Sequence, residues 1–174
     1  MGCDTMTPDQ LAKSGSEHGI QRAFVAYCNV AARHGFVSAN LWADGFLKPP
    51  FPDVPKSPPV TPLLWLHAIP NGGARGDNAK SSAIRGAQLK AEGLTKGVLD
   101  MHLPYPRMPW HGLYIDFKKP KKGRAEPEQI DFAKYLLTMG YAYSFETSWR
   151  SAVALIKAYI EADDQPTFNH VHLE

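Results

Sequence analysis

The sequence is short of the features that mark exported or membrane proteins. Only two of its 174 residues are cysteine, Cys3 and Cys28, which excludes a disulfide framework and a four-cysteine zinc site. No apolar run approaches the length of about 18 residues that a membrane span needs, and no secretory leader is visible. These absences favour a reducing, intracellular setting, and we expect a cytoplasmic protein with no membrane attachment.

The chain also has little net charge, but the charge that it has is unevenly placed. The formal net charge is +2. Between Asn71 and Arg124, however, eleven basic residues stand against four acidic ones, a net charge of +7. Such a segment favours a polyanionic partner, while a merely solvated basic face stays open as the alternative.

The hydrophobic pattern predicts one α/β domain over residues 16–162. Its 44% hydrophobic residues are enough for one core of this size. Residues 1–15 are predicted to be a flexible N-terminus and residues 163–174 a tail. Helical and strand periods alternate along the domain. We expect helices over 16–35, 78–93, 126–140 and 148–162, and strands over 63–68, 98–103, 113–118 and 141–145.

The segment from Phe36 to Pro62 is predicted to be a long loop inserted in the domain. It holds "LKPPFPDVPKSPPVTP", whose seven prolines cannot continue a helix or pair in a central sheet. The apolar run "LLWLHA" that follows is typical of a strand buried on both faces, so Trp65 is expected in the core. Trp110 is expected to pack as well, although stacking on a base is an alternative.

Two predicted strands carry acidic residues among apolar ones. Alternate residues of a strand share a face, so in "LYIDFK" Asp116 and Lys118 face the same way. If "VLDMHL" pairs with this strand as a hairpin, Asp100 comes to lie beside Asp116. Two close carboxylates repel unless a cation joins them, and hard oxygen ligands suit Mg²⁺ or Mn²⁺. An aspartate and a lysine spaced in this way are often a surface ion pair, but the pairing with Asp100 indicates a site for phosphodiester hydrolysis.

A glycine-bearing segment, "PNGGARG", could bring backbone amides close to a phosphate. Gly72 and Gly73 permit the approach and Arg75 adds charge, while a tight turn is the alternative. It is not a nucleotide-binding loop, because no Gly-Lys-Ser/Thr follows, and we expect no nucleotide cofactor. The histidines on or near strands are expected to form hydrogen bonds instead of binding metal. They are His67, His102 and His111.

Several segments in order resemble the VRR-NUC (virus-type replication-repair nuclease) family of the PD-(D/E)XK nuclease superfamily. These are "SEHGIQ", "HAIPNGGARG", "LKAEGLTKGVLD", "LYIDFKKPKKGRAEPEQIDF" and "GYAYSFETSWRSAVALIKAYI". The likeness spans Glu17 to Glu161, interrupted by the proline-rich loop. It implies an α/β restriction-endonuclease-like fold, with a central mixed β-sheet flanked by α-helices. It also implies a Mg²⁺- or Mn²⁺-dependent endodeoxyribonuclease.

The resemblance carries roles over to particular residues. The catalytic positions match Glu17, Asp100, Asp116, Lys118 and Gln129. The metal-binding positions match Glu17, Asp100, Asp116 and Phe117. The DNA-binding positions match Asn71, Gly72, Gly73, Arg75, Lys119, Lys121, Lys122 and Arg124. Without the resemblance, Glu17 could equally be a carboxylate that stabilises a helix start, and Gln129 a capping residue.

Two departures from the family's pattern are visible. Leu99 stands where the superfamily has proline, and Asp116 stands where many relatives have glutamate. Neither change removes a ligand, because the proline binds no metal and aspartate keeps the carboxylate.

Small relatives of this kind resemble Holliday-junction resolvases, which implies a homodimer acting on branched DNA and a phage or bacterial setting. Alternatives are a nuclease that nicks DNA or cuts flaps or single strands, and a catalytically silent DNA-binding protein. An enzyme acting on a small phosphorylated metabolite is disfavoured by the basic segment.

Overall fold

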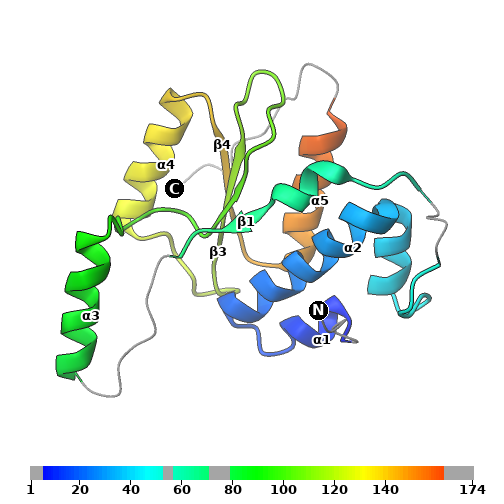
Figure 1. Ribbon diagram of the computed structural model, residues 1–174, viewed down its shortest axis with the longest axis horizontal. Helices are drawn as coiled ribbons and strands as arrows, with labels where there is room; N and C mark the ends of the chain where they lie inside the picture. The colour runs from blue at the N-terminus through cyan, green and yellow to red at the C-terminus, as the bar shows by residue number, and fades with distance from the viewer. Residues whose placement is uncertain (1–5, 53–56, 71–78, 163–174) are drawn as a thin grey trace.

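A mixed β-sheet lies at the centre of the chain, with helices on both of its faces (Figure 1). The structure is a computed structural model that describes residues 6–52, 57–70 and 79–162. Within these residues four strands pair in the order β1 (His67–Ala68), β2 (Met101–Leu103), β3 (Leu113–Phe117) and β4 (Ala142–Glu146). The pairs β1–β2 and β2–β3 are antiparallel, whereas β3 and β4 are parallel. The predicted mixed sheet of an α/β protein is confirmed.

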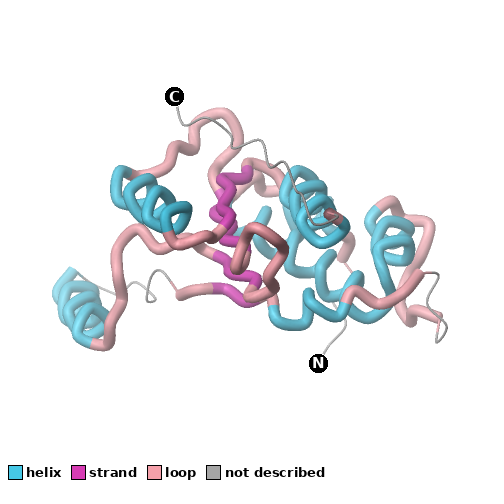
Figure 2. The backbone as a smooth tube through the Cα atoms, turned by 90° about the horizontal axis from the view of Figure 1, so that it is seen from above, coloured by secondary structure: helices cyan, strands magenta, loops and turns pink. Residues whose placement is uncertain are grey.

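Three helices cover the sheet. The long helix α2 (Glu17–Ala43) and the last helix α5 (Trp149–Glu161) lie on one face, and α4 (Pro127–Thr138) lies on the other (Figure 1). On the first face, the ring of Phe24 on α2 packs 5.5 Å from that of Phe117. On the second, Phe132 of α4 meets Tyr114 edge to face at 5.9 Å. Helix α3 (Ala79–Ala91) stands away from the sheet in both views (Figure 2).

Helix α2 begins where the sequence predicts but extends further. Ser16 caps it by accepting a hydrogen bond from the backbone N–H of Gly19 at 3.1 Å. A buried stripe that includes Ile20, Phe24 and Tyr27 faces the sheet. Gly35 was expected to end the helix. It instead forms a kink with φ 77° and ψ 167°, after which residues 36–43 are again helical. The expected loop over 36–62 is therefore corrected for its first eight residues.

The expected buried strand over 63–68 is wrong. Thr61–Trp65 forms a 3₁₀ helix, η1, with Pro62 in its first turn, where its missing N–H and its fixed φ are tolerated. Only His67 and Ala68 pair with the sheet, as its edge strand β1, and both are exposed. The run therefore buries Leu63 but leaves Trp65 72% exposed, so Trp65 is not in the core.

The N-terminal segment is more ordered than expected. Pro8–Ala12 forms a short helix, α1, whose Leu11 is buried against α2. Asp9 fixes it to α5, accepting hydrogen bonds from Trp149 Nε1 at 2.9 Å and Arg150 Nη2 at 2.7 Å. Residues 8–12 of the segment that was expected to be flexible are therefore helical in the structure. The expected tail, 163–174, lies outside the described residues.

The other helices and the hairpin follow the sequence pattern. Helices α3, α4 and α5 and strands β3 and β4 lie within a few residues of their predicted places. Within the described residues, no helix combines the length and the apolar character needed to cross a bilayer.

The kink at Gly35 generates a prediction about stability. A Cβ placed there would lie 2.5 Å from the carbonyl oxygen of Ser57 and 2.7 Å from that of Pro58, at a positive φ. Gly35→Ala should therefore lower the free energy of unfolding by at least about 2 kcal/mol in denaturant titrations. The matched control is Gly86→Ala on α3, where a Cβ meets open space. We expect it to be neutral or stabilising by up to about 1 kcal/mol. An equal loss of unfolding free energy in both variants would contradict a specific need for glycine at the kink.

Candidate active site

The hairpin of β2 and β3 brings the two predicted aspartates to one edge of the sheet. Its register pairs Met101 with Ile115 and His102 with Tyr114. One step further along, Asp100 and Asp116 are opposite each other. Asp100 Oδ2 accepts a hydrogen bond from the backbone N–H of Phe117 at 3.1 Å. The expected juxtaposition of the two carboxylates is confirmed.

Asp116, Lys118 and Gln129 form a connected polar group beneath this edge. Asp116 is fully buried and Lys118 is 8% exposed, and the two form an ion pair. Gln129, on the first turn of α4, donates from Nε2 to Asp116 Oδ1 at 2.8 Å. Its Oε1 accepts from Lys118 Nζ, also at 2.8 Å. From α4, Gln129 thus contacts both members of the ion pair.

The capping of α4 holds Gln129 in this orientation. Its Oε1 also accepts the backbone N–H of Glu126 at 3.0 Å, as in a capping box. The sequence left a capping role and a catalytic role open as alternatives for Gln129. In the structure one side chain makes the capping contact and the contacts to Asp116 and Lys118.

Glu17 and Gln21 reach the same edge from the start of α2. Glu17 Oε1 accepts the backbone N–H of Lys119 at 3.2 Å. One turn on, Gln21 Nε2 contacts the sulfur of Met101 at 3.1 Å. Glu17 also lies in the first turn of its helix, where a negative charge is favourable. All five predicted catalytic residues therefore come from α2, the hairpin and α4 to one end of the sheet.

The electrostatics of the site disfavour ionisation of Asp116. Burial, then the negative charge of Asp100, raise the pKa of the Asp116 carboxyl to about 6, against the lowering effect of Lys118, and Glu17 raises it slightly further. Its Oδ2 touches the Lys118 ammonium but has no aligned hydrogen bond among the described residues. A cation bound here would relieve the repulsion between the Asp100 and Asp116 carboxylates.

The donor set suits a hard cation, although its members are not closely gathered. Among the described residues no group of three or more His, Cys, Asp or Glu side chains is arranged to hold a metal ion. Asp100 and Asp116 are neighbours, and Glu17 is near enough to influence Asp116. Phe117 has a buried apolar side chain, so only its backbone carbonyl could bind a metal. Carboxylate and carbonyl oxygens are the donors that Mg²⁺ and Mn²⁺ prefer.

The predicted DNA-binding residues fall into two groups. Asn71, Gly72, Gly73 and Arg75 lie outside the described residues. The others are exposed in the turn that follows β3. That turn is closed by a hydrogen bond from the Gly123 N–H to the Lys119 carbonyl at 2.9 Å. The exposed basic residues are Lys119, Lys121, Lys122 and Arg124.

The histidines on or next to the sheet make ring contacts. The ring of His102 stacks on Tyr114 at 4.3 Å and meets that of His67 at 5.3 Å. Burial, then the nearby His67, lower the pKa of His102. His111 packs on Tyr141 at 5.8 Å. Trp110 is partly buried against the core, which agrees with the expectation that it packs.

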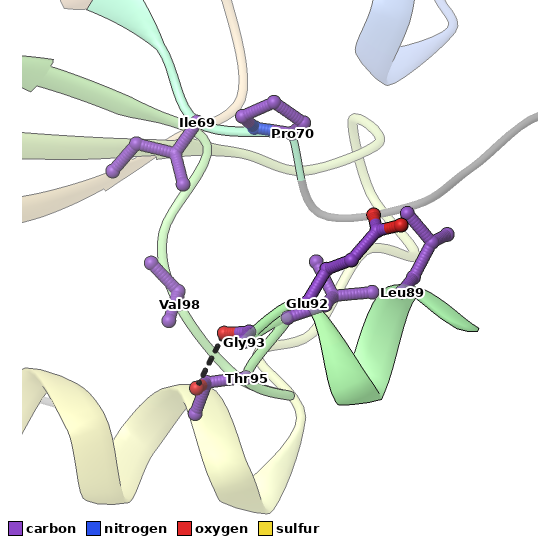
Figure 3. Close-up of a pocket in the computed structure, with 8 residues that line it drawn as sticks. Ile69, Pro70, Leu89, Glu92, Gly93, Thr95 and Val98 are labelled. Atoms are coloured by element: carbon purple, nitrogen blue, oxygen red, sulfur yellow. Dashed lines mark hydrogen bonds between the residues drawn. The ribbon is translucent and has the colours of Figure 1, made fainter. Parts of the chain in front are cut away.

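A cavity of about 310 Å³ lies between the ends of β1 and α3, apart from the carboxylates (Figure 3). The Thr95 hydroxyl donates to the Gly93 carbonyl at 3.3 Å, a hydrogen bond that Figure 3 marks with a dashed line. Glu92 is the one charged residue among those that line it. Since none of the predicted site residues that the structure describes lines it, we assign the candidate site to the sheet edge and not to this cavity.

Comparison with known proteins places the fold. No family model and no curated protein matches the chain. A solved structure described as a "VRR_NUC domain protein" is similar to it, with 22% sequence identity and a TM-score of 0.50. The match covers 65% of this chain and 82% of that one. The chain therefore has the α/β restriction-endonuclease-like fold that the sequence resemblance implied.

The raised pKa of Asp116 generates a prediction about pH. Because the folded-state pKa, about 6, exceeds the ordinary value of 3.8, the folded protein loses stability as the pH rises through this interval. Above pH 6 the ionised carboxylate costs about 3 kcal/mol, so Asp116→Asn should stabilise the metal-free protein. In denaturant titrations with EDTA, the gain in the free energy of unfolding that Asp116→Asn brings should be larger at pH 8 than at pH 4.5 by about 2 kcal/mol. A gain that is the same at both pH values would show that Asp116 ionises normally.

Proposed function

We propose that this chain is a VRR-NUC nuclease that hydrolyses phosphodiester bonds in DNA with the help of Mg²⁺ or Mn²⁺. The observation that carries the proposal is the joined group of Asp116, Lys118 and Gln129 with Asp100 beside it. A buried carboxylate with a raised pKa, next to a second carboxylate and a buried lysine, is costly for a purely structural site. The fold shared with a VRR_NUC domain protein supports the same assignment.

Each residue of the site has a proposed part. Asp100, Asp116, Glu17 and the carbonyl of Phe117 would hold the cation, which supplies positive charge at the scissile phosphate and acidity to a water. Lys118 is held near that position by Asp116 and Gln129, so its ammonium can orient the attacking water or the phosphate. Gln129 keeps both groups in place from α4.

The exposed basic turn gives the proposed site a place for the DNA backbone. Lys119, Lys121, Lys122 and Arg124 follow directly after Lys118 in the chain and are all exposed. Each phosphate that such a residue neutralises steepens the salt dependence of binding by about 0.9 on duplex DNA. The glycine segment that contains Arg75 is proposed to add further phosphate contacts.

Branched DNA is the proposed substrate, cut by a homodimer in the manner of a Holliday-junction resolvase. A two-fold dimer would present two sites to two strands of a symmetric junction. This part of the proposal rests on family analogy. A nuclease for nicks, flaps or single strands is the first alternative. A silent DNA-binding protein is the second, and the clustered carboxylates argue against it because they would repel DNA.

Cleavage assays test the proposal directly. A labelled four-way junction should be cut in symmetric pairs with Mg²⁺ or Mn²⁺ and remain intact with EDTA, beside matched duplex, single-stranded and flap DNA. Asp116→Ala and Lys118→Ala should each lower the rate by about 100-fold or more, because each removes a group at the scissile phosphate. Asp131→Ala, an exposed acidic residue on α4, is the control and should cut normally.

The outcomes separate the candidates. Cutting of other DNA forms alone would keep the nuclease and discard the resolvase. Binding without any cleavage would favour the silent DNA-binding protein.

Metal binding can be followed without any substrate. At a Mn²⁺ concentration about 100 times its Kd, the free energy of unfolding of the native protein should rise by about 2.7 kcal/mol. This raises the midpoint of thermal unfolding by roughly 5–10 °C. Asp116→Ala should lose most of this shift, whereas Asp131→Ala should keep it. An identical shift in all three proteins would place the metal elsewhere.

A further inference from the structure

A groove runs along the side of α2 that faces away from the sheet. It has a volume of about 670 Å³ and lies between α2, Leu11 of α1 and the segment that includes Trp42 and Phe51. Its floor is formed by a second stripe of α2, one that the sheet does not cover, with Val25 and Ala26 at its centre. We call this feature the α2 groove.

The charge of the α2 groove is of one sign. Arg22 and Arg33 line it together with His18 and His34, and no acidic residue is among the described residues that do so. Both arginines are exposed, and Arg33 bonds to the carbonyl of Asn29 on its own helix. Since the described lining offers only positive or neutral side chains, it complements an anion.

The walls of the groove offer aromatic rings. Phe51 lies 4.8 Å from the ring of His34, and 6.2 Å from that of Trp42, which it meets edge to face. Cationic side chains beside aromatic and apolar surface are the combination that binds single-stranded nucleic acid. The cations contact phosphates, and the rings and apolar surface contact bases.

The α2 groove begins at the candidate active site. Gln21 lines the groove and also contacts Met101, which follows Asp100 directly in the chain. Glu17 lies one turn earlier on the same helix. The first two turns of α2 therefore contribute both to the candidate site, through Glu17, and to the groove, through Gln21.

We propose that the α2 groove binds an unpaired DNA strand that adjoins the scissile phosphate. The proposal rests on the proposed nuclease function, and within it favours the first alternative substrate, DNA with a single-stranded segment next to the cut, over a fully paired junction. Arg22 and Arg33 contact the phosphates of this strand. The positive lining and the continuity with the site favour this occupant over an acidic peptide or a second copy of the chain.

Binding of a labelled oligothymidylate of about 15 nucleotides tests the proposal, with EDTA present so that no strand is cut. Fluorescence anisotropy over a series of salt concentrations gives the affinity and its salt slope. Arg22→Ala and Arg33→Ala should each flatten the slope by about 0.7, and the double variant by about 1.4 with a tenfold or larger loss of affinity.

Controls separate the groove from general surface charge and from misfolding. Lys134→Ala removes one exposed cation on α4, outside the groove, and should leave the slope unchanged. Arg22→Lys with Arg33→Lys keeps the charge and should retain the slope. Each variant is first shown to unfold at the native midpoint.

A slope in the double variant equal to the native one would overturn the proposal, as would an equal change in Lys134→Ala. A double variant that changes self-association in sedimentation but binds the oligonucleotide normally would overturn it in favour of a second copy. If the groove variants lose oligonucleotide binding but the native protein cuts no DNA, the groove proposal stands and the nuclease proposal fails. If the groove variants cut DNA and bind the oligonucleotide as the native protein does, the nuclease proposal stands and the groove proposal fails.

Discussion

The buried contact between Asp116 and Lys118 is the constraint around which the rest of the molecule is arranged. A carboxylate without solvent exposure is tolerated only with compensating partners, because desolvation disfavours its charge. Lys118 supplies an opposite charge and Gln129 a hydrogen bond. Even so, the pKa of Asp116 stays raised, since Asp100 stands beside it. The fold thus holds an arrangement that is unfavourable without a further cation.

This constraint explains why two helices begin at the same edge of the sheet. Helix α4 starts there because Gln129 must reach Asp116 and Lys118, and the same side chain caps its first turn. Helix α2 starts there on the opposite face, with Glu17 bonded to the backbone of Lys119. The N-terminal ends of helices carry partial positive charge. Both ends therefore lie where carboxylates gather and where a phosphate is proposed to bind.

The sequence predicts the site better than it predicts the outer parts of the fold. The period of two in the hairpin strands was enough to place Asp116 and Lys118 on one face, and the hairpin brought Asp100 to them. The run "LLWLHA" misled because apolar composition cannot distinguish a buried strand from a 3₁₀ turn that exposes Trp65. The sequence predicts a helix end at Gly35 instead of a kink because it shows the glycine but not the packing of Ser57 against it.

The kink also shows how one helix serves three purposes. Before Gly35, the inner stripe of α2 packs on the sheet through Phe24, and its first turn carries Glu17 to the carboxylates. The outer stripe, with Arg22 and Arg33, lies outside the apolar periodicity from which the helix is predicted. That periodicity therefore does not predict the groove. After Gly35 the helix changes direction, and Trp42 with Phe51 closes the end of the α2 groove. A straight helix would carry the same residues away from that stripe, so the glycine conformation forms the groove as well as the fold.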